Sequence, residues 1–332
     1  MKKYSYLFVI AFSFFIHTSF SQAWNTPVLV DSYTRPGGDA GQYTSHLIVN
    51  GNPAIAYYDV YHGNLMFVRA NDASGTTWAT PIAVDHQGNA GQYASLQIVN
   101  GNPAISYYDA TTTSLKYVRA SDASGSSWGA PAVIDTAGIV GQCTSLQVVN
   151  GNPAISYYKS TGQDLKYVRA NDASGATWGT PLALEVTTNV GQYTSLQIIN
   201  GNPGISYYDA SNGELKFKRA SDASGTTWSA AITVDGTSNP TGLYTSLQVV
   251  NGLPAISYYN SNNGDLKYIR ATDVSGATWA ASLTLDNSST IVGQYTSMQI
   301  INGNPAISYY DNTNGFLMYR RSNDISGTGW AT

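Results

Sequence analysis

Short stretches in which apolar and polar residues alternate recur along the whole chain, separated by residues that favour turns. In one such unit, Leu96 and Ile98 fall on one side of an extended segment, and Ile105 and Tyr107 fall on one side of the next. The dipeptide Asn100-Gly101 lies between these two segments and is typical of a tight hairpin, because both residues tolerate a positive φ. The pattern therefore predicts an antiparallel pair of strands.

Two more strands complete the unit, the third around residues 115–119 and the fourth from Trp128 to Asp135. No stretch of the unit has the period of a helix. Residues 93–142 and 143–192 are identical at 30 of 50 positions, which indicates tandem duplication. The seven tryptophans, spaced by 50 to 54 residues, mark the boundaries of six units: Trp24, Trp78, Trp128, Trp178, Trp228, Trp279 and Trp330.

Six units of four antiparallel strands predict an all-β fold, a six-bladed β-propeller, with a solenoid as the alternative. The propeller is favoured because a solenoid needs atypical end units, and here the first and last units resemble the middle ones. Residues 24–31 already have a fourth-strand sequence, and residues 294–321 supply three strands. We expect the N-terminal strand to join the last blade and close the ring. Residues 330–332 begin a second fourth strand, which is either a redundant stub or the start of further chain.

Charge and cysteine content narrow the classes of partner. The 332 residues include only 11 % charged ones and have a net charge of −4, so nucleic acid is not an expected partner. The single cysteine, Cys143, rules out an internal disulfide framework, and the four scattered histidines do not have the spacing of a zinc site. We expect no cofactor. The polar loops at residues 260–265 and 311–315 leave calcium open, although they lack the spaced acids of a calcium loop.

Residues 1–21 have the pattern of a secretory signal peptide. Lys2 and Lys3 precede an apolar run at residues 4–16, and small residues occupy the −3 and −1 positions of a cut before Gln22. The apolar run is too short to span a bilayer of about 30 Å. The sequence thus predicts a secreted or cell-surface protein without a membrane span, in which residues 22–332 form one domain, a monomeric ring.

The most specific motif is a loop that reads Asp-Ala-Ser-Gly-x-x-Trp with small variations and lies between the third and fourth strands of every unit. It resembles the Asp-box of bacterial-neuraminidase-type repeats, Ser-x-Asp-x-Gly-x-Thr-Trp, with one extra residue between Asp and Gly. The resemblance implies a structural hairpin, in which the carboxylate accepts backbone N–H groups and the tryptophan packs between blades. The residues concerned are Asp72 and Trp78, Asp122 and Trp128, Asp172 and Trp178, Asp222 and Trp228, Asp273 and Trp279, and Asp324 and Trp330.

The arginines, glutamates and aspartates of the sequence do not form a recognisable catalytic set. An arginine beside this loop recurs in each unit, at Arg69, Arg119, Arg169, Arg219, Arg270 and Arg320, which suits a structural hydrogen bond. Only Arg35 and Arg321 remain outside that series, too few for the three-arginine cluster of a sialidase. The only glutamates are Glu185 and Glu214, and the aspartates recur once per blade, so no single pair of carboxylates stands out.

The opposite end of the blades is where the units differ, and it gathers tyrosine, glutamine and aspartate. Aromatic rings pack on the apolar faces of sugars, and amides and carboxylates bond their hydroxyls, so this rim is the candidate ligand site; the alternative is that the tyrosines fill the space between blades. The candidate residues are Gln42, Tyr43, Asp59, Gln92, Tyr93, Asp109, Gln192, Tyr193, Asp209, Tyr244, Gln294, Tyr295 and Asp311.

We expect from these features an exported, non-catalytic binding propeller of lectin-like type, whose partner is a glycan or another cell-surface ligand, bound at several sites. The alternative is a structural or adhesive surface module of a longer protein. A glycoside hydrolase of neuraminidase type is the third hypothesis, so enzymatic activity is not the expectation.

Overall fold

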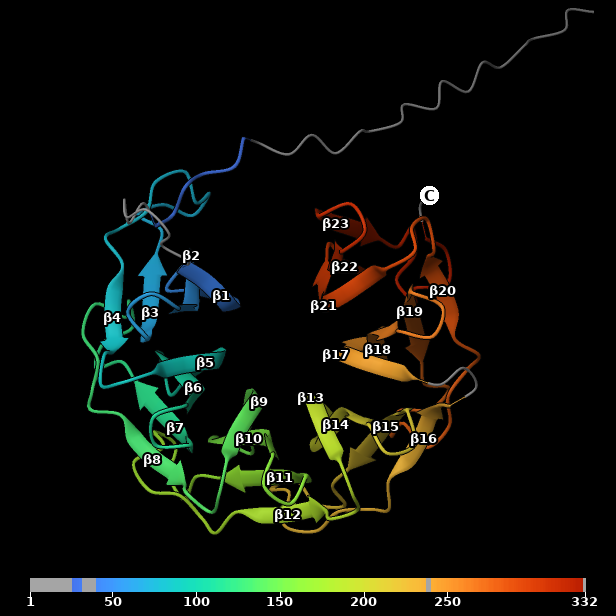
Figure 1. Cartoon of the computed structure of the whole chain (residues 1–332), viewed down its shortest axis with the longest axis horizontal. Helices are drawn as coiled ribbons and strands as arrows, with labels where there is room; N and C mark the ends of the chain where they lie inside the picture. Colours follow the sequence, from blue (N-terminus) through green and yellow to red (C-terminus); the bar gives the residue numbers. More distant parts are fainter. Residues whose placement is uncertain (1–25, 32–39, 237–239, 331–332) are drawn as a thin grey trace, which may run out of the picture.

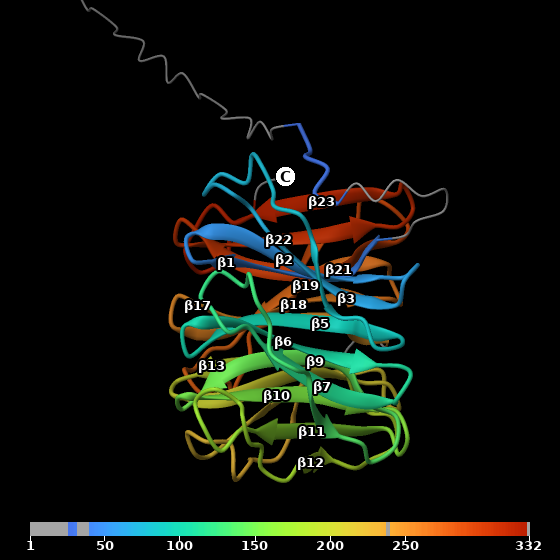
Figure 2. The same ribbon diagram turned by 90° about the vertical axis from the view of Figure 1, so that its left-hand side faces the viewer.

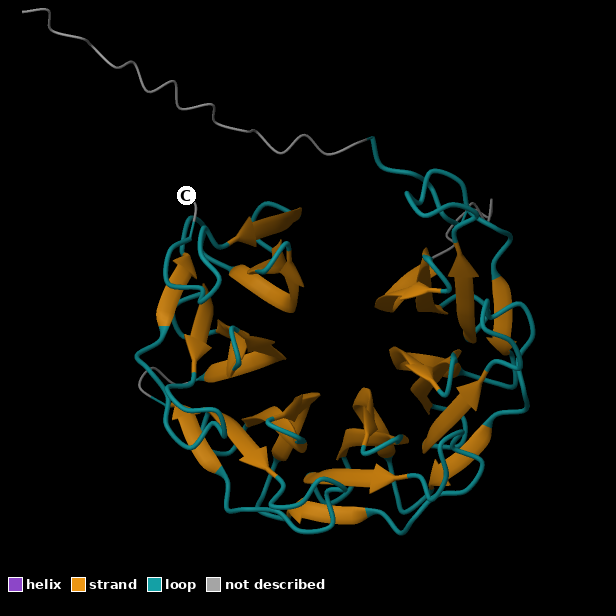
Figure 3. Ribbon diagram, turned by 180° about the vertical axis from the view of Figure 1, so that it is seen from behind, coloured by secondary structure: helices purple, strands orange, loops and turns teal. Residues whose placement is uncertain are grey.

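The computed structural model describes residues 26–31, 40–236 and 240–330, and in these ranges the chain forms β-strands and no helix (Figure 3). Six sheets follow one another around a common axis (Figure 1). The predicted all-β, six-bladed propeller is confirmed. The predicted signal peptide, residues 1–21, lies outside the described residues, in which no helix is long and apolar enough to cross a membrane.

Each blade contains strands in chain order from the centre outwards. Blade 1 has β1 (Ala40–Val49), β2 (Asn52–Asp59), β3 (Asn64–Arg69) and β4 (Ile82–Asp85). Blade 2 has β5 (Ala90–Val99), β6 (Asn102–Asp109), β7 (Ser114–Arg119) and β8 (Ala132–Asp135). Blade 3 has β9 (Val140–Val149), β10 (Asn152–Lys159), β11 (Asp164–Arg169) and β12 (Leu182–Glu185).

Blade 4 has β13 (Val190–Ile199), β14 (Asn202–Asp209), β15 (Glu214–Arg219) and β16 (Ile232–Asp235). Blade 5 has β17 (Thr241–Val250), β18 (Leu253–Asn260), β19 (Asp265–Arg270) and β20 (Leu283–Asp286). Blade 6 has β21 (Val292–Ile301), β22 (Asn304–Asp311) and β23 (Phe316–Arg321). Figure 2 shows the ring from its side.

The predicted hairpin between the first two strands is present in every blade. Asn100 and Gly101 have φ values of 45° and 81°, and the equivalent Asn-Gly pairs have similar ones. The predicted fourth strand is shorter than expected: Trp128 makes only an isolated bridge to Ala120, and the strand begins at Ala132. The intervening residues belong to the loop that the Asp-to-Trp motif builds.

Apolar side chains of neighbouring blades form common clusters. One cluster joins Leu115 and Tyr117 of blade 2 to Leu146, Ile155 and Tyr157 of blade 3, all nearly inaccessible to solvent. The blades also approach closely where each first strand begins. A Cβ on Gly141 would lie 2.7 Å from the Cα of Leu115, so a side chain at this glycine would push the blades apart.

Hydrogen bonds across each junction repeat with the same geometry. The Leu146 N–H donates to Ser95 Oγ at 3.0 Å, and the Thr144 hydroxyl donates to the carbonyl of Tyr93 at 2.8 Å. The tryptophan of the Asp-to-Trp loop also reaches back one blade: Trp128 contacts Phe67 edge to face, with ring centroids 5.0 Å apart. Trp178, Trp228, Trp279 and Trp330 make the same contact with the preceding blade, as predicted, whereas Trp78 packs on Tyr57, Met66 and Val68 of its own blade.

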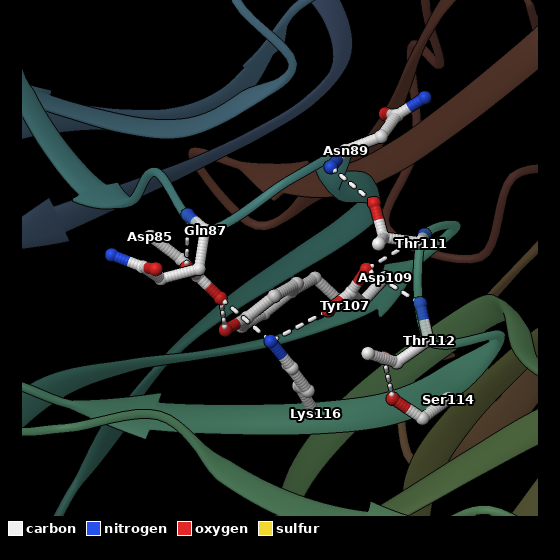
Figure 4. A network of polar contacts seen from close by, with 9 residues as sticks. All are labelled: Asp85, Gln87, Asn89, Tyr107, Asp109, Thr111, Thr112, Ser114 and Lys116. Carbon is white, nitrogen blue, oxygen red and sulfur yellow. Dashed lines mark hydrogen bonds and ion pairs between the residues drawn. The ribbon is translucent and has the colours of Figure 1, made fainter.

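A buried aspartate–tyrosine bond links the outer strand of one blade to the second strand of the next. In Figure 4 the Tyr107 hydroxyl donates to Asp85 Oδ2 at 2.6 Å, and Lys116 Nζ lies 3.2 Å from the same oxygen and 2.6 Å from Asp109 Oδ2. Burial and the bond to Asp85 raise the pKa of Tyr107, so its hydroxyl stays protonated and able to donate. Blades 3, 5 and 6 make the same bond through Tyr157, Tyr258 and Tyr309.

Blade 4 is the exception. Its neighbour supplies Glu185 in place of the aspartate, and this longer carboxylate pairs with Lys218, which stands where other blades have an apolar residue or Arg320. The hydroxyl of Tyr207 is buried and, in the described part of the chain, has no hydrogen-bond partner. Glu185 and Lys218 together thus replace the tyrosine–aspartate hydrogen bond between these blades with an ion pair.

The last blade has three strands in the described residues, and residues 26–31 contain no strand. The expected pairing of the N-terminal segment with β23 is therefore not among the strand pairs of the structure. Asp31 instead accepts a bond from Tyr57 at 2.5 Å, as Asp85 does from Tyr107. One register prediction is wrong: Arg321, and not Arg320, pairs with Ala306 in the way that Arg119 pairs with Ala104, because two adjacent arginines made the sequence alignment ambiguous.

The contrast between blades 3 and 4 gives a prediction about stability. Tyr157→Phe removes the donor to the buried Asp135 carboxylate and should lower the free energy of unfolding by about 1–3 kcal/mol. Tyr207→Phe removes a hydroxyl without a partner and should leave stability unchanged or raise it. Urea unfolding followed by tryptophan fluorescence measures both. Equal losses in the two variants would contradict a role for the aspartate–tyrosine bond.

Candidate functional site

The starts of the first strands and the ends of the second strands meet at one end of the blades, here called the rim. In blade 2, Gln92 pairs with Tyr108 and Ala90 with Asp109, and every other blade repeats this register. The structure thus brings the predicted tyrosine, glutamine and aspartate positions to one end, and it places the Asp-to-Trp loops at the other.

A β-bulge aims the first-strand tyrosine of each blade. Between the pairs Gln92–Tyr108 and Ser95–Ser106, two residues of β5 face a single residue of β6. Tyr93 lies in this bulge with φ of 56°, a left-handed backbone that is uncommon for a large side chain. The same conformation recurs at Tyr43, Cys143, Tyr193, Tyr244 and Tyr295, with φ between 51° and 54°. All six blades, which are tandem copies of one unit, share this uncommon conformation.

These tyrosines form two runs of packed rings. The ring centroids of Tyr43 and Tyr93 are 4.4 Å apart; Tyr244 lies 4.5 Å from Tyr193 and 4.3 Å from Tyr295. Cys143 separates the two runs. The terminal tyrosines are the most accessible, with Tyr43 40 % and Tyr295 63 % exposed. The rim therefore presents aromatic surface on either side of the thiol.

Each Tyr-Tyr pair of the second strand packs inside the fold. The first member makes the aspartate bond between blades except in blade 4, and in blade 2 the second lies beneath the rim tyrosine, with Tyr108 6.5 Å from Tyr93. Both tyrosines are buried except in blade 6, where Tyr310 is half-buried. Of the two hypotheses for this pair, packing is the one that the contacts support.

The rim aspartates are also buried, and their carboxylates are used within the blade. Asp109 is fully buried, accepts the backbone N–H groups of Thr111 and Thr112, and pairs with Lys116. Asp59, Asp209 and Asp311 are 3–6 % exposed and cap the same turn. The tyrosines and glutamines thus remain as the accessible part of the predicted site.

The rim glutamines belong to small polar networks. Gln192 donates to Asn189 Oδ1 at 2.7 Å, and the same oxygen accepts the Tyr158 hydroxyl at 2.9 Å. Gln92 and Tyr58 share Asn89 in the same way, and Gln42 and Gln294 hold the equivalent positions in blades 1 and 6. The sequence analysis overlooked these asparagines, which lie in the variable loops before the first strands.

At the opposite end, the Asp-to-Trp loops close on themselves. Asp122 accepts the backbone N–H groups of Ser124, Ser126 and Ser127. Although partial burial works against it, these bonds hold the pKa of Asp122 below its usual range. The repeat arginines serve the same end of the blades: Arg119 Nε donates to the Val99 carbonyl at 2.8 Å, and Arg69, Arg169, Arg219, Arg270 and Arg321 do the equivalent.

Blade 5 has two largely buried carboxylates with opposed environments at the rim end, Asp265 8 % exposed and Asp286 6 % exposed. Asp265 begins β19, and Asp286, the last residue of β20, pairs in register with the next residue, Leu266. Burial raises the pKa of Asp265, and the charge of Asp286 adds to this against the opposing charge of Lys267. Burial alone would raise the pKa of Asp286 too, but hydrogen bonds from Ser288 and Tyr309 lower it. Two neighbouring carboxyls with pKa values displaced in opposite directions are the arrangement that acid–base chemistry uses.

No group of three or more metal-binding side chains occurs among the residues that the structure describes. In one of the two loops considered as calcium sites, residues 311–315, the Asp311 carboxylate accepts hydrogen bonds from Asn314 and Ser289.

A comparison with solved structures shows proteins of the same architecture. The Hadza microbial sialidase Hz136 matches 81 % of this chain and 63 % of its own, with a TM-score of 0.57 and 16 % identity. The NanB sialidase from Streptococcus pneumoniae matches 86 % of this chain and 68 % of its own, with a TM-score of 0.57 and 12 % identity. At these low sequence identities, the similarity shows that the fold is shared. The chain thus spans roughly two thirds of these sialidases' length.

No protein-family model matches the sequence. A search of curated proteins also found no match. Two predictions from the sequence, a non-catalytic lectin-like module and the absence of enzymatic activity, are overturned by this comparison, in which the two solved structures described above are sialidases. The prediction relied on symmetry among the units; the two acids of blade 5 hold repeat positions, but their carboxyl pKa values are displaced in opposite directions.

Cys143 provides a test of the rim's packing. Burial raises the pKa of its thiol to about 11, so the thiolate needed for alkylation is scarce at pH 8. We expect iodoacetamide to modify Cys143 more than about 100-fold more slowly than an exposed cysteine at pH 8, and the rate to rise with pH up to about 11. A Val186→Cys change in a Cys143→Ser background supplies the exposed reference, since Val186 is 70 % exposed. Equal rates would contradict this packing.

Proposed function

We propose that this chain is a glycoside hydrolase that acts on neutral glycans at the rim. The observation that carries the proposal is the pair Asp265 and Asp286, whose carboxyl pKa values are displaced in opposite directions on adjacent strands. Hydrolysis of a glycosidic bond uses two such carboxyls, one protonated and one ionised.

The environments assign the two roles. Asp265, with the raised pKa, is the general acid that protonates the leaving oxygen. Asp286, held ionised by Ser288 and Tyr309, is the carboxylate that activates water or attacks the sugar. Tyr244 and Tyr295 stand near the start of the first strands of blades 5 and 6, on either side of this pair in sequence. Tyr295 packs on Tyr244 and, being 63 % exposed, offers aromatic surface to a sugar ring.

Arginine placement favours a neutral substrate. A sugar carboxylate would call for a cluster of free guanidinium groups, whereas six of the described arginines donate to backbone carbonyls at the far end of the blades. In this proposal the Asp-to-Trp loops are variant Asp-boxes that only stabilise the blades. The proposed export signal at residues 1–21 would deliver the enzyme to secreted or cell-surface glycans.

Turnover of 4-methylumbelliferyl glycosides tests the proposal, with neutral sugars and a sialoside in one panel. We expect a neutral glycoside to be hydrolysed and Asp286→Asn to lower kcat by about 100-fold or more. Asp265→Asn should also lower kcat and should abolish the decline of rate at high pH that loss of the acid's proton causes.

Asp164→Asn is the matched control, because Asp164 begins the third strand of blade 3 as Asp265 begins that of blade 5. It should retain wild-type activity. Absence of turnover across the panel by the folded protein, or equal rates in wild type and Asp286→Asn, would refute the assignment.

A further inference from the structure

The two end blades expose faces that every inner blade covers. Leu317 of β23 is 83 % exposed, whereas its counterparts in the other blades are fully buried: Leu65, Leu115, Leu165, Leu215 and Leu266. Phe316 beside it is 59 % exposed. On blade 1 the complementary half is open too: a Cβ on Gly41 would meet no atom within 4 Å. In the inner blades the same Cβ would lie 2.6–2.7 Å from the leucine of the preceding blade.

These two faces are the halves of the same contact. Each inner junction packs the first-strand glycine of one blade on the third-strand leucine of the blade before it, as Gly91 packs on Leu65. Figure 1 shows blades 1 and 6 standing apart on the open side of the ring, and no strand of one pairs with a strand of the other. The open side therefore continues an interface that the molecule already forms five times.

The N-terminal segment occupies a fourth-strand position next to blade 1. Asp31 bonds Tyr57 as the fourth-strand Asp85 bonds Tyr107, and Val30 packs against the cluster of Tyr57, Met66 and Val68. Residues 27–31 thus stand where the outer strand of a preceding blade would stand.

Residues 27–31 are not the fourth strand of blade 6, because the fourth-strand position of blade 6 starts at Trp330. Trp330 bridges Ser322 and contacts Tyr268 with ring centroids 5.2 Å apart, as the other tryptophans do at the start of their own fourth strands. Trp330 therefore marks the start of a fourth-strand position beside β23. There are thus two fourth-strand positions next to the opening, one at residues 27–31 and one that starts at Trp330. Blade 6 supplies three inner strands for the second position only, so residues 27–31 have no inner strands of their own.

We propose that the open side between blades 1 and 6 receives one further three-stranded unit of the same repeat chemistry, with residues 27–31 as its fourth strand. Such a unit presents a first-strand glycine to Leu317 and a third-strand leucine to Gly41. Its third-strand aromatic residue receives Trp78, as Phe67 receives Trp128. The completed ring has seven blades, and the apolar side chains of both end faces become buried.

Thiol labelling of a cysteine at the opening tests the proposal in the full chain. One protein carries Leu317→Cys in a Cys143→Ser background, and a second adds after Thr332 a copy of residues 282–321, which continue from the equivalent point of blade 5. We expect rapid labelling of Leu317→Cys in the first protein and at least tenfold slower labelling in the second.

Two controls keep the result specific. Val186→Cys, far from the opening in sequence and 70 % exposed, should label equally with and without the addition. An addition of the same length and shuffled sequence should not protect Leu317→Cys. Unchanged labelling after adding the repeat would overturn the proposal.

Two outcomes in the protein without the addition would also overturn it. Protection of Leu317→Cys that is independent of concentration would mean that blades 1 and 6 close on each other. Protection that grows with concentration, together with a doubled mass in light scattering, would mean that a second copy covers the face.

Discussion

The close approach of glycine to leucine at each blade junction is the contact on which the other interactions depend. A single four-stranded sheet of this chain is apolar on both faces, and it is stable only when both are covered. Because the glycine has no side chain, the first strand of one blade settles against the third strand of the blade before it. That approach brings the serine, threonine and aspartate–tyrosine bonds within reach, and it sets the spacing at which the rim tyrosines stack.

Local pattern predicted the elements well, because each is specified by residues close together in sequence. The turn at Asn100-Gly101 and the alternation at Ile105 and Tyr107 depend on neighbours only. The junctions were harder to foresee, since the partners of Tyr107 lie one unit away, at Asp85. The recurrence of an acid at the end of every fourth strand was the available signal, but recurrence alone does not say which blade the acid bonds.

The sequence predicted where the candidate residues lie, but not what their side chains do there. Tyr93 and Gln92 lie at the rim as expected, yet the positive φ falls on Tyr93 itself, a residue type that does not predict this conformation. Asp109 has the residue type of a ligand-binding group but caps its own turn. Asp265 and Asp286 escaped notice because their distinctness is electrostatic: it comes from burial, Lys267, Ser288 and Tyr309, which only the folded chain brings together.

The ion pair of Glu185 and Lys218 has a consequence for how such a gene can change. Near-identical DNA repeats exchange segments by unequal crossover, and most units here are interchangeable because their junctions use the same residues. Glu185 and Lys218, however, lie in adjacent units. A crossover between them would leave a buried ammonium or a misplaced carboxylate without its partner, at a cost in stability. Selection would therefore keep this pair of units together while the others are free to multiply or be lost.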